Sequence, residues 1–99
     1  MAYQIIYKKR FVQKLFKLLD YLNSEWSEGV ADKFIDELQK RLSTLSKQPY
    51  IGAPSTVVKL VRSILITKHN RIYYRIKGNQ IEVVNMYDMR INPKKNRYM

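Results

Sequence analysis

Two stripes of apolar residues at helical spacing follow each other in the first half of the chain, and they constrain its fold most strongly. Apolar side chains that recur every three or four residues give a helix one apolar face, which must be buried. The first stripe begins after about Lys9, and Ser27 predicts the N-cap of the second helix. The second stripe stops before Pro49, because proline disfavours helix at the preceding residue. The stripes consist of Phe11, Leu15, Leu18, Leu19, Leu22 and Trp26, and of Ala31, Phe34, Ile35, Leu38, Leu42 and Leu45.

Two such helices joined by a short link form an antiparallel hairpin that has to pack on another layer. Runs rich in β-branched and aromatic residues supply that layer, with predicted strands over residues 3–7, 60–67, 71–77 and 81–87. Residues 49–54 are expected as a loop and Gly78-Asn79 as a tight turn. The fold class is therefore α+β, in the order β-α-α-β-β-β, with the helical hairpin packed on one face of a mainly antiparallel twisted sheet. Residues 1–99 are expected to form a single domain, with Trp26 in its core or in the packing of the helical hairpin.

The net charge of +11 is distributed unevenly along the chain. Residues 1–37 hold six Lys or Arg and six Asp or Glu, whereas residues 38–99 hold thirteen cations and two anions. The whole excess lies in the second part, and it favours nucleic acid, a membrane surface or an acidic protein as partner without choosing among them. No apolar run approaches the roughly 20 residues of a membrane span, and the N-terminus lacks the order of a signal peptide. We therefore expect a cytoplasmic protein with no membrane partner.

Arginines are threaded through the predicted strands, and only Glu82 and Asp88 oppose them. Because side chains alternate along a strand, Ile72, Tyr74 and Ile76 should pack under the helices, while their neighbours face outward. An outward tyrosine among arginines could stack on a nucleobase or hold the arginines by cation–π contact. The predicted phosphate- or partner-binding surface consists of Arg62, Arg71, Tyr73, Arg75 and Arg90.

Cofactor and metal chemistry finds little support in the sequence. The chain has no cysteine, no phosphate-cradling glycine loop and no GxSxG motif. His69 is the single histidine, without a ligand pair at metal-binding spacing, and we expect it in an exposed turn. The tail after Arg90 is expected as a loop or a short mobile extension. We predict no cofactor, no metal and no small-molecule substrate.

Several segments together resemble one known superfamily over nearly the whole chain. They are the run SEGVADKFIDELQKRLSTL, the loop PYIGAP, Arg62 at the opening of a strand, the segment RIYYRIKGNQIEVV and the ending YDMRINPKK. In this order they are similar to the RelE/ParE superfamily of toxins from bacterial type II toxin–antitoxin systems. The resemblance implies a small basic toxin that is held inactive by a cognate antitoxin, acidic in the part that wraps the toxin.

The superfamily contains two activities on one fold, so the fold alone does not decide the function. RelE-like members cut messenger RNA in the ribosomal A site, and ParE-like members poison DNA gyrase. Arg71 and Arg90 match two arginine positions of the nucleases, Arg62 stands where a lysine is common, and Ile64 replaces a second cation. The acid/base position near the C-terminus is not clearly filled, since Tyr87 precedes Arg90 and Tyr98 lies in the tail.

The resemblance therefore favours a ParE-like toxin that poisons DNA gyrase by protein–protein contact. The alternative is a RelE-like, metal-independent endoribonuclease that acts on mRNA at the ribosome with Arg62, Arg71, Arg90 and Tyr87. A third possibility is a generic basic module that binds nucleic acid. An antitoxin segment that binds as an amphipathic helix or an added strand needs an apolar groove beside a basic rim. Val12 and Phe16, which flank the first stripe, could supply this groove.

Overall fold

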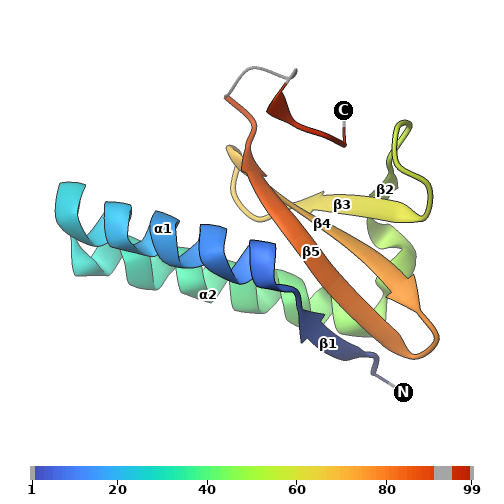
Figure 1. Ribbon diagram of the computed structural model, residues 1–99. Coiled ribbons are helices and arrows are strands. Elements are labelled where there is room, and N and C mark those ends of the chain that lie inside the picture. Colours follow the sequence, from blue (N-terminus) through green and yellow to red (C-terminus); the bar gives the residue numbers. More distant parts are fainter. Residues whose placement is uncertain (1, 91–94, 99) are drawn as a thin grey trace.

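The computed structural model describes residues 2–90 and 95–98, in which two helices pack against a five-stranded sheet (Figure 1). The strands come in two groups, one short strand before the helices and four after them. The elements are β1 (Gln4–Tyr7), α1 (Lys9–Glu25), α2 (Glu28–Lys47), the 3-10 turn η1 (Pro49–Ile51), β2 (Ala53–Pro54), β3 (Val61–Leu65), β4 (Asn70–Lys77) and β5 (Gln80–Asp88).

The sheet has the strand order β1-β5-β4-β3-β2, so the first and last strands of the chain are neighbours. β1 pairs in parallel with β5, and the other three pairings are antiparallel. The predicted α+β class, the hairpin on one face and the mainly antiparallel sheet are confirmed. The structure adds β2, two residues long, within the segment that the sequence assigned to a loop.

The helical hairpin covers one face of the sheet, as the apolar stripes predicted. Ser27 is the N-cap of α2, where its hydroxyl oxygen accepts a hydrogen bond from the Val30 backbone N–H at 3.3 Å. Beneath the helices, the main cluster of buried residues joins both helices to β4 and β5. Its members are Phe11, Phe34, Leu38, Leu42, Ile66, Ile72, Val83 and Met86.

A β-bulge in β5 settles which way the side chains of that strand point. Tyr73 pairs with Asn85 and Tyr74 with Val83, so Val84 has no partner on β4. The extra residue lets Ile81 and Val83 face the helices on one side of the bulge, while Met86 returns to the same face on the other. Alternation alone could not assign this strand, because the pattern changes phase in its middle.

Trp26 contradicts its prediction as a core residue, because 68% of it is exposed. The tip of the helical hairpin projects beyond the edge of the sheet (Figure 1), and Trp26 is the C-cap of α1 at that tip. The stripe of α1 therefore continues past the last strand that could bury it. Within the described residues, neither helix is long and apolar enough to cross a membrane.

The end of the chain folds back over the second face of the sheet (Figure 1). Asn96 is 3% and Tyr98 7% exposed, so the tail at these residues is a packed loop and not a mobile extension. Residues 91–94, also expected in that tail, lie outside the described residues. Tyr73, expected to face solvent, is only 3% exposed because the returning segment covers it. The second face is thus covered at its centre.

Candidate partner-binding surface

Arg71 lies on the second face of the sheet, at the centre of the predicted surface. Its Nη1 donates a hydrogen bond to Ser63 Oγ on β3 at 3.0 Å. Arg71 is half-buried and lines a shallow depression of about 360 Å³. The other lining residues are Pro54, Ser55, Thr56, Ser63, Tyr73, Met89 and Tyr98. One guanidinium surrounded by hydroxyl groups forms the polar part of this depression.

Three tyrosines pack together beside Arg71. Their mutual contacts cover the ring of Tyr73, which the sequence predicted to be available for a ligand. Tyr73 lies parallel to Tyr98 with ring centroids 4.4 Å apart, and both rings contact Tyr87 edge-on. The Tyr73 hydroxyl accepts a hydrogen bond from Asn96 Nδ2 at 2.9 Å, while Tyr98 is held through its carbonyl by Ser55 Oγ. The Tyr73 ring is therefore closed to a nucleobase, and it packs on tyrosines rather than on arginines.

Arg75 is also on the second face, but an acid neutralises its charge. Its Nε donates to Glu82 Oε1 at 2.5 Å across the β4–β5 pair, and Lys8 Nζ stands 4.0 Å from the other carboxylate oxygen. The hydrogen bond from Arg75 lowers the pKa of Glu82, against the opposing effect of burial. Glu82 is thus a charged anchor for two cations, and it holds the Arg75 guanidinium against β5.

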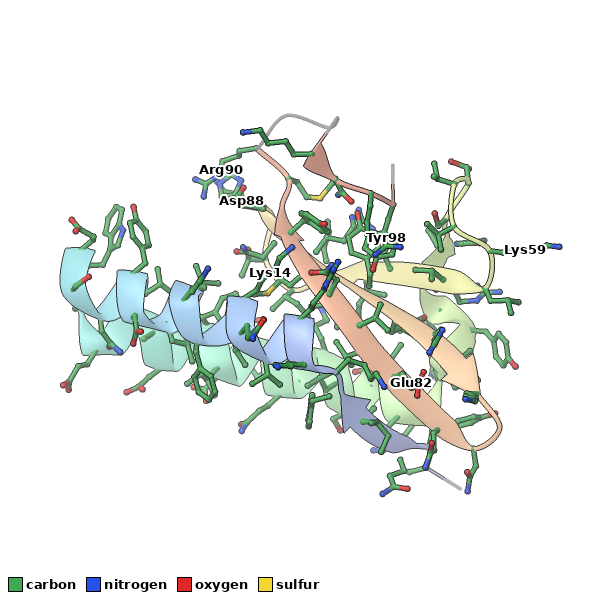
Figure 2. The ribbon with its side chains drawn as sticks, in the orientation of Figure 1. Lys14, Lys59, Glu82, Asp88, Arg90 and Tyr98 are labelled. Atoms are coloured by element: carbon green, nitrogen blue, oxygen red, sulfur yellow. The ribbon has the colours of Figure 1, made fainter. Side chains whose placement is uncertain are left out.

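Arg90 repeats this pattern at the other end of β5, as Figure 2 shows. Its guanidinium contacts both carboxylate oxygens of Asp88, at 2.9 and 2.5 Å, and these hydrogen bonds lower the pKa of Asp88. The pair lines a depression of about 490 Å³ with His69 and Trp26, beneath the tip of the helical hairpin. Arg90 therefore belongs to a different part of the surface from Arg71.

Arg62 lies on the face of the sheet that the helices cover. Its cross-strand partner is Tyr74, whose ring packs against Leu45 of α2. The Arg62 guanidinium donates to the carbonyl oxygens of Gly52, at 2.8 Å, and of Tyr50, at 3.3 Å. It therefore fixes the segment between α2 and β3. The structure brings together Arg71, Tyr73 and Tyr87 of the predicted residues, but not Arg62, Arg75 and Arg90.

Val12 and Phe16, predicted to receive the antitoxin, lie in one apolar groove of about 300 Å³ between α1 and α2. Phe16 is 61% exposed, so the groove has an accessible aromatic side chain. Its other lining residues are Tyr7, Phe11, Leu15, Leu19, Ile35, Leu38, Gln39 and Leu42. A continuous apolar groove on the surface of a small protein is typical of an interaction site.

Sequence reasoning missed a second polar site, where α1 runs beside β5. Lys14 is labelled in Figure 2. Its Nζ lies 3.4 Å from the centre of the Tyr87 ring, and burial, followed by the charge of Arg10, lowers the pKa of Lys14. The apolar stripe of α1 leaves Arg10, Lys14 and Lys17 on the other side of the helix, where cations are ordinarily solvated. Their spacing of four and three residues, from Arg10 to Lys14 and Lys17, was the available signal.

The described residues hold no group of three His, Asp or Glu side chains arranged to bind a metal ion. His69 stands in the turn before β4, where its backbone N–H donates to Thr67 Oγ1 at 3.2 Å. Its side chain borders the depression with Arg90, away from the tyrosines. Among the described residues the His69 side chain makes no hydrogen bond, although its charge helps to lower the pKa of Asp88 after the larger effect of Arg90.

Solved structures of bacterial toxin–antitoxin proteins are similar to this fold. The chromosomal ParDE system from P. aeruginosa matches with a TM-score of 0.74 and 13% identity, over 88% of this chain and 96% of that chain. The E. coli toxin RelE, a mutant in the free state, matches with a TM-score of 0.65 and 17% identity, over 99% and 95%. A YoeB/ParE toxin from Agrobacterium tumefaciens matches with a TM-score of 0.61 and 14% identity, over 86% and 96%.

The fold is therefore that of a RelE/ParE-superfamily toxin, which confirms the resemblance seen in the sequence. The family model of the ParE toxin of type II toxin–antitoxin systems, parDE, matches residues 5–92, and the chain belongs to this family. No curated protein matches the chain in sequence.

Proposed function

We propose that this toxin inhibits DNA gyrase by protein–protein contact in the cytoplasm and is neutralised by a cognate acidic antitoxin. The observation that carries the proposal is the state of the strand arginines. Arg75 and Arg90 are paired with acids, and Arg62 is bound to backbone carbonyls on the opposite face. The membership of the ParE family supports the same target.

Metal-free cleavage of RNA at the 2′-hydroxyl requires more of the site than binding to a protein partner does. It needs a base for the hydroxyl proton, an acid for the departing 5′ oxygen and free cations around the phosphorane. On the second face, Arg71 is the one strand arginine within the described residues that is neither paired with an acid nor bound to a carbonyl. A single guanidinium is a weak basis for this reaction, which favours binding over cutting.

The alternative, a ribosome-dependent mRNA endonuclease, is favoured by one feature. Tyr98 packs on Tyr73 and lines the same depression as Arg71, so a tyrosine near the C-terminus stands beside a cation. In that mechanism Arg71 would hold the phosphate, and the Tyr98 or Tyr87 hydroxyl would transfer a proton. Neither hydroxyl has a base among its hydrogen-bond partners within the described residues.

Controlled expression in bacteria with two readouts separates the two activities. Gyrase poisoning predicts filamentation and a DNA damage response while translation continues, and the purified chain should inhibit supercoiling of a plasmid by gyrase. Rapid loss of translation with cleaved messages would instead support the endonuclease. Absence of any growth effect would contradict both, provided that the protein accumulates in folded form.

The apolar groove on α1 and α2 is the proposed site for the antitoxin. Phe16→Ser should weaken binding of the antitoxin encoded beside the toxin by about tenfold or more, because an exposed aromatic anchor is lost. Tyr21→Ser is the matched control, since Tyr21 is a 54% exposed aromatic residue of the same helix that lies outside the groove. Equal affinities for the two variants would refute this location.

A further inference from the structure

A polar cleft of about 260 Å³ lies where α1 passes alongside β5, and the toxin mechanism above does not use it. Three cations of α1, at spacings of four and three residues, face it, and no acid lines it. Each lining residue carries a side-chain hydrogen-bond donor. The lining residues are Arg10, Gln13, Lys14, Lys17, Asn85 and Tyr87.

Asn85 on β5 supplies a donor that lacks an acceptor. The residue is 1% exposed, and its Oδ1 accepts a hydrogen bond from the Met86 backbone N–H at 2.9 Å. This bond fixes the orientation of the amide, because a flipped group would set two donors against each other. Its Nδ2 has no hydrogen-bond partner among residues 2–90 and 95–98. A buried donor without an acceptor is costly, and in a residue that lines a basic cleft it suits an oxygen acceptor of a ligand or a water.

No acid lines the cleft, so its cations have no carboxylate partner within it. Lys14 loses part of its hydration and stands near Arg10, and these two effects lower its pKa in that order. α1 begins at Lys9 without an acidic residue in its first turn, so the positive end of the helix dipole adds to the field. An anion in the cleft would oppose both effects, because its charge favours the protonated form of Lys14.

We propose that this cleft binds a backbone phosphate of a nucleic-acid strand. Arginine, lysine, asparagine, glutamine and tyrosine are the side chains that contact phosphates in protein–nucleic acid complexes, and all five types line the cleft. Protein partners, in contrast, gain affinity from apolar or aromatic anchors that enter a pocket, and the cleft has no aliphatic lining residue.

Recognition at this cleft is independent of base sequence. The face of the Tyr87 ring is occupied by Lys14, at 3.4 Å from the ring centre, so no open aromatic surface remains for a base. The cleft therefore holds a strand by its backbone, and this inference does not depend on gyrase being the target of the toxin.

The side-chain amide of Asn85 is a direct reporter of binding in a 1H–15N correlation spectrum. We expect its two NH2 resonances to shift on titration with short oligothymidylate at low salt, and to shift less with inorganic phosphate at equal concentration. Unmoved Asn85 resonances with both probes would overturn the proposal. Shifts with inorganic phosphate alone would overturn the assignment to a nucleic-acid strand.

Two double variants distinguish binding of the oligonucleotide at the cleft from general electrostatic attraction to the basic protein. Lys14→Gln with Lys17→Gln should weaken oligothymidylate binding by about tenfold or more, whereas Lys40→Gln with Lys47→Gln removes the same charge from exposed sites on α2 and should cost under about threefold. Because the cleft holds one backbone phosphate, the salt dependence should fall by about 0.7 in slope for the first pair.

Two further results would refute the proposal. One is an equal loss of affinity in both double variants. The other is tighter binding of a polyglutamate peptide than of oligothymidylate of equal charge, with the same shift of the Asn85 amide, which would assign the cleft to an acidic protein. Thermal unfolding of each variant shows whether a lost signal reflects lost structure.

Discussion

The two faces of the sheet are covered in different ways. On the first face, two helices bury a continuous aliphatic cluster around Phe11, Ile72 and Val83. On the second face, residues 95–98 cover a smaller cluster of tyrosines and valines, held by hydrogen bonds of Asn96 and Ser55. The first face depends on apolar area, whereas the second depends on specific polar contacts. The second face is therefore the more sensitive to single polar changes and the more open to a partner.

The first 37 residues and the rest of the chain also differ in charge. The net charge of each segment does not show which of its cations lack an acidic partner. In the basic second part of the chain, Arg75 forms an ion pair with Glu82, and Arg90 forms one with Asp88. The formal charges of the first 37 residues sum to zero. These residues nevertheless contribute the three cations that line the α1–β5 cleft, and no acid is among the lining residues. Segment charge predicts attraction to anions, and only the fold shows which cations remain available.

Gly52→Ala is expected to have the largest effect, by breaking the packing of the helix-covered face. A Cβ at this position would collide with the Tyr74 hydroxyl and stand 2.9 Å from the Ser63 carbonyl oxygen. The Tyr74 hydroxyl would lose the hydrogen bond from the Gly52 backbone N–H, 3.0 Å long. We expect a loss of about 3 kcal/mol in the free energy of unfolding. Urea denaturation measures it.

Gly29→Ala is the control for that measurement, since an added Cβ there meets only Ser27 Oγ at 3.7 Å. In the first turn of α2 alanine is a better helix former than glycine, so this variant should be neutral or slightly more stable. If both glycine variants unfold at the same urea concentration, the contact of Gly52 with Tyr74 is not part of the solution structure.

Tyr98→Ala tests how much the second face contributes to stability. Tyr98 is 7% exposed and stacks on Tyr73, so its removal should cost about 2 kcal/mol and expose the Tyr73 ring. Trp26→Ala, at a residue 68% exposed, should stay within about 0.5 kcal/mol of the parent. Urea unfolding followed by circular dichroism compares them. A cost for Trp26 as large as that for Tyr98 would mean that the hairpin tip is packed in solution.

Glu82→Gln should cost about 1 kcal/mol at neutral pH, since the carboxylate that binds Arg75 becomes neutral. Because the folded protein lowers the pKa of Glu82, its contribution is fully present above the unfolded pKa of about 4.3 and is lost as the pH falls through the folded value. The difference in unfolding free energy between parent and variant should therefore shrink below about pH 4. A difference that grows on acidification would reverse the assignment.

Leu60→Gly is expected to have the smallest effect, and a stabilising one. Leu60 leads into β3 with φ of +66°, a left-handed conformation that costs a non-glycine residue about 1 kcal/mol, and it is 83% exposed. Glycine removes this strain but adds freedom to the unfolded chain, which leaves a gain of about 0.5 kcal/mol. Val57→Gly, also exposed but without positive φ, should be neutral or destabilising. Thermal melts distinguish the two signs.

The sequence predicted the elements well because each depended on local spacing or on a cap, as for the two stripes and Ser27. It failed where a distant segment decided the outcome. The burial of Tyr73 depends on Tyr98, and the exposure of Trp26 depends on where the sheet ends beneath α1. Ion pairs such as Arg75 with Glu82 require the register of β4 and β5, which the bulge at Val84 sets.

The parallel pairing of β1 with β5 affects when the protein can fold during its synthesis. Gln4 pairs with Gln80, so the first strand finds its neighbour only after the helical hairpin and most of the sheet have been synthesised. Contacts this distant along the chain slow folding. At about 5–20 residues per second, a nascent chain remains unfinished for several seconds on the ribosome. The sheet of this toxin is therefore completed late in synthesis, after β1 has waited for the residues of β5.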